Sequence, residues 1–259
     1  MKQFIFVISA LLILFGCTKR EIVFDNQINE SFEIPTLFQI NGIECAFDAP
    51  SKTLRYSASA SELISFNPLI KFQNHSEVIF LNEELVNNSR NSLGTLEINK
   101  KYPINFVTQG TTTRLYLEFT EIAIVIFSTL DDVHNEEKIL GKMNVNYPNG
   151  VFPNLSTFIG IEHRGKSSLG LPKKSYGIKP LASANPDDLK KISFFGFRPN
   201  EKWSFDAMYN DKSKIRNKLS YEVWKSLNQT SIESNYVEVF LNNRSKGLYR
   251  LGKFILKLN

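Results

Sequence analysis

Short runs of alternating or β-rich residues dominate the chain between residues 36 and 120. Polar connectors containing Asn or Gly separate the runs, and no helical period intervenes. The six runs are residues 37–41, 53–57, 77–81, 96–98, 104–107 and 114–119. Short strands at this spacing are typical of antiparallel β-sandwiches. We therefore expect residues 36–120 to form an immunoglobulin-like β-sandwich that serves as a spacer or binding module.

The pattern changes near residue 121. Residues 122–127 are continuously apolar, which is expected of a strand buried on both faces. Further strand-like runs follow at residues 139–147, 158–164, 175–179, 193–197, 203–207, 236–241 and 247–251. Asn242 and Asn243 supply a turn signal between the last two runs. These runs predict a mainly antiparallel sheet over residues 121–259.

One strong helix is predicted within this second part. Asp211 stands where a carboxylate would accept hydrogen bonds from the free amides of the helix start. The apolar residues that follow share one helical face. They are Ile215, Leu219, Val223, Trp224 and Leu227. The second part is therefore expected to be α+β, a sheet that carries one main helix.

Composition and charge exclude few classes of protein. Hydrophobic residues make up 42% of the chain and charged residues 22%, as in ordinary globular proteins. The net charge of +5 mildly favours anionic partners, but Lys and Arg are spread along the chain. Neither zinc-ligand spacing nor a nucleic-acid recognition motif is present in the sequence. We therefore expect no nucleic-acid partner.

The first residues have the pattern of an export signal. A short basic start precedes an apolar run over residues 4–15, which is too short to span a membrane. The run ends in Leu-Phe-Gly-Cys17, which resembles a bacterial lipobox. Residues 1–17 are thus predicted to be a lipoprotein signal peptide, with a diacylglyceryl lipid on Cys17 and a tether over residues 18–35. A plain signal peptide with an incidental Cys17 is the alternative.

A basic, glycine-containing stretch carries the candidate chemistry. It reads His-Arg-Gly-Lys-Ser-Ser over residues 163–168 and Pro-Lys-Lys-Ser-Tyr-Gly-Ile-Lys over residues 172–179. A Gly-Lys-Ser-Ser turn lets backbone amides approach an anion closely. Arg164 offers a planar fork for phosphate, and Lys173 or Lys174 a point charge on a long stem. The alternative is a solvated pair of strand lysines that protects a sheet edge.

Three blocks in order resemble the spore-coat protein H (CotH) kinase family. They are the stretch just quoted, residues 203–220 with Trp-Ser-Phe-Asp and Arg-Asn, and residues 236–251 with Val-Glu-Val-Phe-Leu and Gly-Leu-Tyr. The resemblance covers about residues 122–251. It implies transfer of the ATP γ-phosphate to serine on extracytoplasmic proteins, with Mg²⁺. The residues that it implies for phosphate binding are Arg164, Lys166, Lys174, Arg216 and Asn217, and it favours Lys174 over Lys173.

The resemblance also predicts what this chain lacks. In the family a further segment follows and carries the aspartates that bind metal. The paired acids at residues 131–132 and 187–188 lie in polar loops and match no family block. We therefore expect the CotH-like domain, residues 121–259, to be truncated at its C-terminus, and we assign no catalytic or metal-ligating residue.

The resulting expectation is an exported lipoprotein, anchored to a bacterial membrane in the cell envelope, with a CotH-like kinase domain that is inactive as this chain. An extracytoplasmic protein substrate or a surface polymer would be its partner. The alternative is a non-catalytic surface lipoprotein that binds a polymer or a protein through its β-sandwich.

Overall fold

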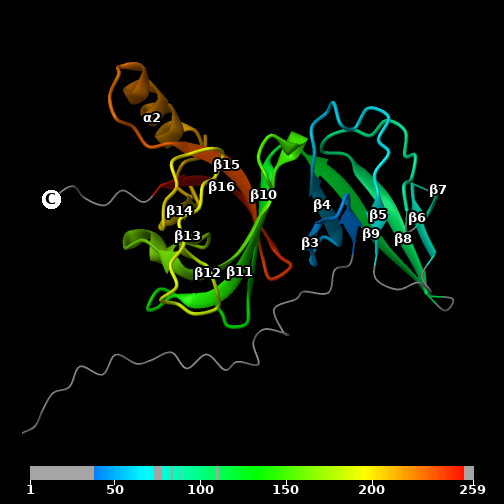
Figure 1. Ribbon diagram of the computed structural model, residues 1–259, viewed down its shortest axis with the longest axis horizontal. Coiled ribbons are helices and arrows are strands. Elements are labelled where there is room, and N and C mark those ends of the chain that lie inside the picture. Colours follow the sequence, from blue (N-terminus) through cyan, green and yellow to red (C-terminus); the bar gives the residue numbers. More distant parts are fainter. Residues whose placement is uncertain (1–37, 73–77, 83, 88, 109–110, 254–259) are drawn as a thin grey trace, which may run out of the picture.

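The computed structural model describes residues 38–72, 78–82, 84–87, 89–108 and 111–253. The predicted signal peptide, Cys17 and the tether lie outside the described residues. Two β-rich bodies lie side by side and meet at β10 (Ala123–Thr129), as Figure 1 shows. Both bodies are built mainly of strands, and one α-helix is present among the described residues.

The N-terminal body contains two sheets. A three-stranded sheet has the order β2-β1-β5, and a six-stranded sheet has the order β3-β4-β9-β8-β6-β7. Their strands are β1 (Gln39–Ile40), β2 (Ile43–Glu44), β3 (Ala46–Asp48), β4 (Thr53–Ser57), β5 (Ile70–Lys71), β6 (Val78–Leu81), β7 (Glu84–Val86), β8 (Lys101–Thr108) and β9 (Thr111–Thr120). All neighbours are antiparallel except β4 and β9, which are parallel. The predicted β-rich character is confirmed, whereas the immunoglobulin-like class stays a prediction.

The core of this body is aromatic and aliphatic. Phe119 is fully buried and makes edge-to-face contacts with Tyr56, Phe66 and Tyr102. The run at residues 96–98 was expected to be a strand, and this was wrong. Leu96 is buried, but the segment contributes only an isolated bridge from Ile98 to Phe119. Its apolar side chains fill the core from a loop. Periodicity alone could not distinguish such a buried loop from a strand.

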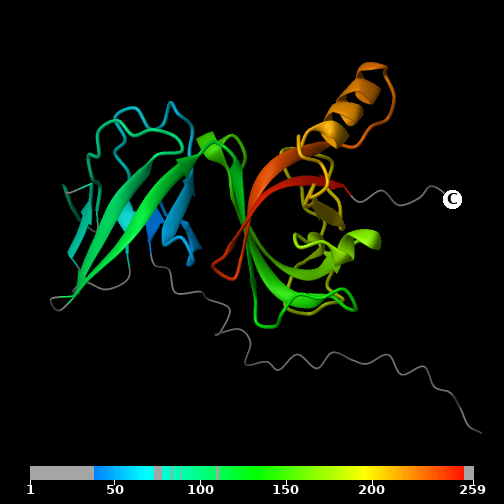
Figure 2. The same cartoon turned by 180° about the vertical axis from the view of Figure 1, so that it is seen from behind.

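The second body is a closed barrel of seven strands rather than an open sheet. Its order is β10-β11-β12-β13-β14-β16-β15, closed by the parallel pair of β10 and β15. The other strands are β11 (Ile139–Asn146), β12 (Leu155–Arg164), β13 (Ser175–Leu181), β14 (Trp203–Asp206), β15 (Ser234–Leu241) and β16 (Ser245–Lys253). Figure 2 shows the barrel from the opposite side. Closure leaves this sheet without free edges.

The barrel explains the apolar run of β10. Val125 and Phe127 belong to the barrel core, whereas Ile124 and Ile126 point to the other face. There they pack with Ala46 of β3 in the N-terminal body. A strand covered on both faces reads as continuously hydrophobic. The prediction of a strand buried on both faces is therefore confirmed.

Aromatic residues fill the barrel. Trp203 and Phe205 of β14 are fully buried, and Phe194 packs against Trp203 with ring centroids 4.8 Å apart. The expectation of a strand at residues 193–197 was wrong, because the chain there forms turns and contributes no ladder. Phe194 nevertheless reaches the core from this loop. Its burial explains the aromatic pattern that indicated a strand.

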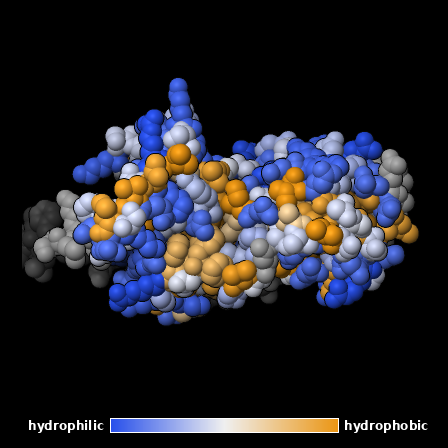
Figure 3. All heavy atoms as spheres, turned by 90° about the horizontal axis from the view of Figure 1, so that it is seen from above, coloured by the Kyte–Doolittle hydropathy of each residue, from blue (hydrophilic) through white to orange (hydrophobic). Residues whose placement is uncertain are grey.

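The helix α2 (Arg216–Ser226) extends away from the barrel (Figure 1). Its predicted apolar face does not pack on the sheet, and none of its residues is buried. Ile215, Leu219, Val223, Trp224 and Leu227 are each between 52% and 59% exposed. Figure 3 shows hydrophobic atoms at the surface of the half that carries α2. Within the described part of the chain, no helix is long and apolar enough to cross a membrane.

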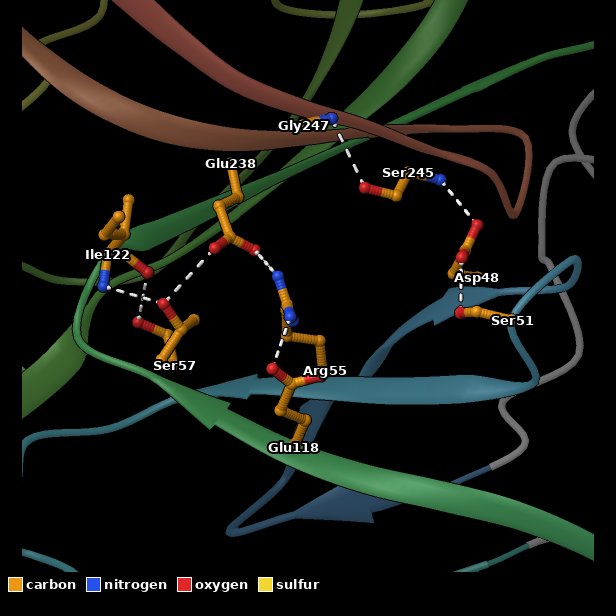
Figure 4. Close-up of polar contacts among 10 residues, drawn as sticks. Asp48, Ser51, Arg55, Ser57, Glu118, Ile122, Glu238, Ser245 and Gly247 are labelled. Atoms are coloured by element: carbon orange, nitrogen blue, oxygen red, sulfur yellow. Dashed lines mark hydrogen bonds and ion pairs between the residues drawn. The ribbon is translucent and has the colours of Figure 1, made fainter. Parts of the chain in front are cut away.

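Polar contacts join the two bodies (Figure 4). Asp48 accepts a hydrogen bond from the amide of Ser245 at 2.9 Å, and Asn146 donates to the carbonyl of Glu44 at 3.0 Å. Between the bodies the chain passes from β9 to β10 through Glu121 and Ile122 alone. With so short a connection, the contacts hold the two bodies closely together.

Candidate functional site

The glycine-containing stretch connects β12 to β13. β12 ends at Arg164, which pairs with Ser175 at the start of β13, and the 3₁₀ turn Ser167–Gly170 lies between them. Gly165 has φ of +130°, and a Cβ at this position would lie 1.9 Å from Oγ of Ser168. A residue other than glycine is therefore strained here on both counts. The turn can fold back so that Ser168 lies over residue 165 because this residue has no side chain.

Lys173 and Lys174 both precede β13, which begins at Ser175. Neither lysine therefore belongs to the strand, in contrast to the alternative of a pair of strand lysines. Nζ of Lys173 donates to the carbonyl of Leu248 at 2.5 Å and lies 4.2 Å from the ring centroid of Tyr249. Nζ of Lys174 instead donates to the carbonyl of Leu169. The two ammonium groups are thus held by main-chain carbonyls of different segments.

Burial gives Lys173 an unusual acidity. It lowers the pKa of Lys173 from the ordinary value of 10.5 to about 8, and the nearby Lys214 acts in the same direction. Asp206 opposes this change by favouring the charged form. An anion placed beside Lys173 would do the same, because an opposite charge stabilises the ammonium form. Lys173 is therefore electrostatically suited to an anionic ligand.

A cavity of about 300 Å³ lies beside the N-terminus of α2, and we call it the helix-end cavity. Its wall includes residues of two of the three family-like blocks. Lys173 comes from the segment before β13, Asp206 from the end of β14, and Arg216 and Asn217 from the first turn of α2. The fold therefore brings together polar residues that are more than 40 positions apart in the sequence.

Asp206 is held in this cavity by three hydrogen-bond donors. It accepts hydrogen bonds from Arg250 at 2.8 Å, from the amide of Met208 at 2.9 Å and from Asn217 at 3.4 Å. Burial alone would raise the pKa of Asp206, but these donors outweigh it and lower the pKa. Arg164 lies close enough to Asp206 for the carboxylate to oppose the lowering of its pKa by burial. Asp206 thus organises the cations around it.

Asp211 accepts a hydrogen bond from the first amide of α2, as predicted, although Ile215 is the residue at the N-cap position. Its Oδ2 accepts a hydrogen bond from the amide of Arg216 at 3.0 Å, and its Oδ1 accepts one from the hydroxyl of Ser213 at 2.6 Å. The side chain of Arg216 is 73% exposed, with Nε 3.5 Å from Oδ1 of Asp211. Such an exposed pair contributes little to stability. The guanidinium is therefore available to a ligand in the helix-end cavity.

A second cavity of about 660 Å³ opens at the mouth of the barrel, and we call it the barrel-mouth cavity. Lys173 and Tyr209 line both cavities. The other cationic residues of the wall are Lys174 and Lys246, and its aromatic residues include Tyr176 and Tyr249. The two cavities therefore adjoin at Lys173.

The predicted phosphate-binding residues are divided between these places. Arg216 and Asn217 line the helix-end cavity, whereas Lys174 lines the barrel-mouth cavity. Arg164 ends β12 near Asp206, and Lys166 is exposed in the turn and lines neither cavity. In the part of the chain that the structure describes, no group of three or more His, Cys, Asp or Glu side chains is placed to hold a metal ion.

Sequence reasoning missed Arg250 and Lys246. Arg250 follows Gly-Leu-Tyr in the third block, and its pairing with Asp206 was not foreseen. The register of β14 and β16 places the two residues opposite each other. Only the pairing of these strands, 44 residues apart, reveals the contact. Lys246 lies next to a hairpin turn, where a lysine is usually solvated, so its position at the cavity had no sequence signal.

Comparison with known families supports the resemblance. The model of the family described as CotH kinase protein matches residues 161–252, a partial domain. The match begins near the end of β12 and includes both cavities' lysines, α2, β15 and most of β16. The predicted resemblance to this family is confirmed over these residues. No curated protein matches the chain.

Proposed function

We propose that the barrel and α2 form the nucleotide-phosphate-binding part of a CotH-like protein kinase. One observation carries this proposal. Lys173, Asp206, Arg216 and Asn217 lie in three separate segments of the matched region and line one cavity. Phosphoryl-transfer enzymes depend on cations and hydrogen-bond donors placed against phosphate oxygens. The helix-end cavity offers this combination.

Each residue has a distinct role in the proposed site. The Lys173 ammonium supplies a charge at the junction of the two cavities. Arg216 supplies a planar, bidentate donor at the exposed side. Asp206 is a positioning residue, since it holds Arg250 and Asn217 in place through its carboxylate. In this proposal Lys173 has the phosphate-contacting role for which the resemblance favoured Lys174.

ATP fits these residues better than a protein-held metal ion does. The carboxylates of Asp206 and Asp211 are both engaged by protein donors. The described residues therefore do not form a Mg²⁺ site of their own, although a nucleotide brings Mg²⁺ on its phosphates. A few charged hydrogen bonds, less the cost of ordering, give an affinity in the range of about −4 kcal/mol, or about millimolar. We expect weak binding without measurable transfer from the described residues alone.

The place of action is part of the proposal. The lipobox-like ending at Cys17 supports export, lipidation and anchoring in a bacterial envelope, with an extracytoplasmic protein or surface polymer as partner. Mass spectrometry of the mature N-terminus tests this. A diacylglyceryl group on Cys17 is expected, and an unmodified terminus beyond Thr18 would contradict it.

Calorimetric titration of the purified chain with ATP, ADP and AMP tests the binding function. We expect affinity to fall with the loss of phosphates, and Asn217→Ala and Arg216→Ala to weaken ATP binding by about fivefold each. Lys225→Gln, at the far end of α2, is the matched control and should bind as the native chain does. ATP binding that is absent, or unchanged in both cavity variants, would leave the alternative of a non-catalytic binding protein.

A further inference from the structure

The barrel-mouth cavity has a charge that the proposed nucleotide site does not explain. Lys173, Lys174 and Lys246 line it, and Asp132 is its one acidic wall residue. Its volume of about 660 Å³ lies within the range of about 300–1,000 Å³ that is usual for small-molecule sites. The helix-end cavity, by contrast, has two carboxylates beside its cations.

Two of the three lysines are held by main-chain carbonyls rather than by acidic side chains. Lys173 and Lys174 donate to the carbonyls of Leu248 and Leu169. Among the described residues none of the three lysines forms an ion pair with a carboxylate. Clustered like charges raise the free energy of the empty site, and a bound anion would relieve this repulsion. The cluster is therefore complementary to an anion.

The surroundings of His163 report the same positive field. Burial lowers the pKa of His163, and Lys174, His134 and Lys246 lower it further. The neutral imidazole then forms a polar but uncharged part of the wall. Tyr209, which is 44% exposed, supplies the accessible aromatic ring of the wall, whereas Tyr176 and Tyr249 are almost fully buried. The cavity thus combines a cationic rim with an exposed aromatic ring.

We propose that the barrel-mouth cavity is a second ligand site, which binds a small organic anion with two or more negative charges and a flat or apolar body. The ammonium groups bind the charged groups, and the exposed ring of Tyr209 contacts the body. The site is separate from the nucleotide site, although both share Lys173. Lysines are point charges, so carboxylates and phosphates are both suitable charged groups.

Two probe anions distinguish carboxylate from phosphate as the charged group that the cavity binds. They are benzene-1,3,5-tricarboxylate and 1-naphthyl phosphate. Each is titrated into the full chain by calorimetry, with 1-naphthol as the uncharged control. We expect at least one anion to bind, Lys246→Gln to weaken it about tenfold, and Asn217→Ala to leave it unchanged. Lys174→Gln gives a second variant on the same wall. Tighter binding of either anion supports the proposal and identifies the charged group.

Three results would count against an anion site in the barrel-mouth cavity or against its being separate from the nucleotide site. If neither anion binds, or if Lys246→Gln and Lys174→Gln bind as the native chain does, the cavity is not an anion site. If saturating ATP displaces the anion and Asn217→Ala weakens both ligands equally, the two cavities form one nucleotide site. A chain that binds the anions but not ATP would show that only the nucleotide site fails, and a chain that binds ATP but neither anion would show that only the present proposal fails.

Discussion

The guanidinium of Arg55 donates to Oε2 of Glu238 at 2.7 Å and thereby joins the N-terminal body to the barrel. Arg55 lies on β4 and Glu238 on β15, which are 183 residues apart in the sequence. The same guanidinium contacts Glu118 of β9 at 2.6 Å (Figure 4). One cation therefore compensates two largely buried carboxylates at the junction of the two bodies.

Replacing Arg55 should destabilise the junction. In Arg55→Met the carboxylates of Glu118 and Glu238 would face each other without a cation. Removing one partner of a fully buried pair costs about 3–5 kcal/mol, and the partial exposure of this pair reduces the expectation to about 2 kcal/mol. Urea unfolding measures the loss. Arg114→Met, on an exposed part of β9, is the control, and an equal loss in both variants would contradict the assigned role.

The same variant bears on the domain boundary, which stays a prediction. Residues 121 and 122 connect β9 to β10. If contacts such as Arg55–Glu238 protect this connection, limited proteolysis should cut it faster in Arg55→Met than in the native chain. Unchanged cleavage there would show that the junction does not depend on this ion pair.

Gly165→Ala should disturb the turn between β12 and β13. The backbone has φ of +130°, and the new methyl group would meet Ser168. Strain of this kind costs about 1–3 kcal/mol. Gly170→Ala is the matched control in the same turn, because its Cβ would meet nothing within 4 Å. Thermal unfolding should separate the two variants, and similar melting temperatures would show that the turn relaxes.

Several strands of both bodies could be predicted because their sequence patterns are strong. Residues 53–57 and 122–127 lie where strands were expected, and the helix begins close to Asp211. Closure of the barrel could not be predicted, since it depends on the pairing of β10 with β15 across more than 100 residues. Loops with aromatic residues, such as residues 193–197, have a strand-like sequence pattern because their irregular backbone still places aromatic side chains in the core.

The candidate site was predictable in its residue types but not in its partners. Blocks resembling a known family pointed to Arg216 and Asn217, which do line a cavity. The resemblance favoured Lys174 over Lys173, whereas Lys173 is the lysine that lines both cavities. Which ammonium reaches which cavity is decided by the carbonyls of Leu248 and Leu169, and no local pattern encodes them.

The apolar face of α2 should contribute little to the stability of this chain. Trp224 is 53% exposed, so Trp224→Ser is expected to change the free energy of unfolding by less than about 0.5 kcal/mol. Trp203→Ala is the buried counterpart and should cost about 3–5 kcal/mol. Urea unfolding of both variants tests the contrast. A large loss in Trp224→Ser would mean that the face is covered in solution.

Lys173 should give the protein a distinctive alkaline pH dependence. Its pKa is about 8 in the folded chain, below its ordinary value of 10.5, because burial and Lys214 disfavour the ammonium. Between these two values the unfolded chain binds more protons than the folded chain, so the contribution of Lys173 to stability rises with pH. Below about pH 8 the full destabilising effect is present. Lys173→Met should therefore gain most over the native chain at neutral pH and lose this advantage toward pH 10.5.

The same titration should control phosphate binding. A bound phosphate favours the charged lysine, so ATP affinity should fall as the pH rises above about 8 and Lys173 loses its proton. Calorimetric titrations with ATP at neutral and alkaline pH measure this for the native chain and for Lys173→Met. The variant should bind ATP more weakly at neutral pH and show a flatter dependence. An equally steep fall in both proteins would mean that another group titrates and that Lys173 does not contact the phosphate.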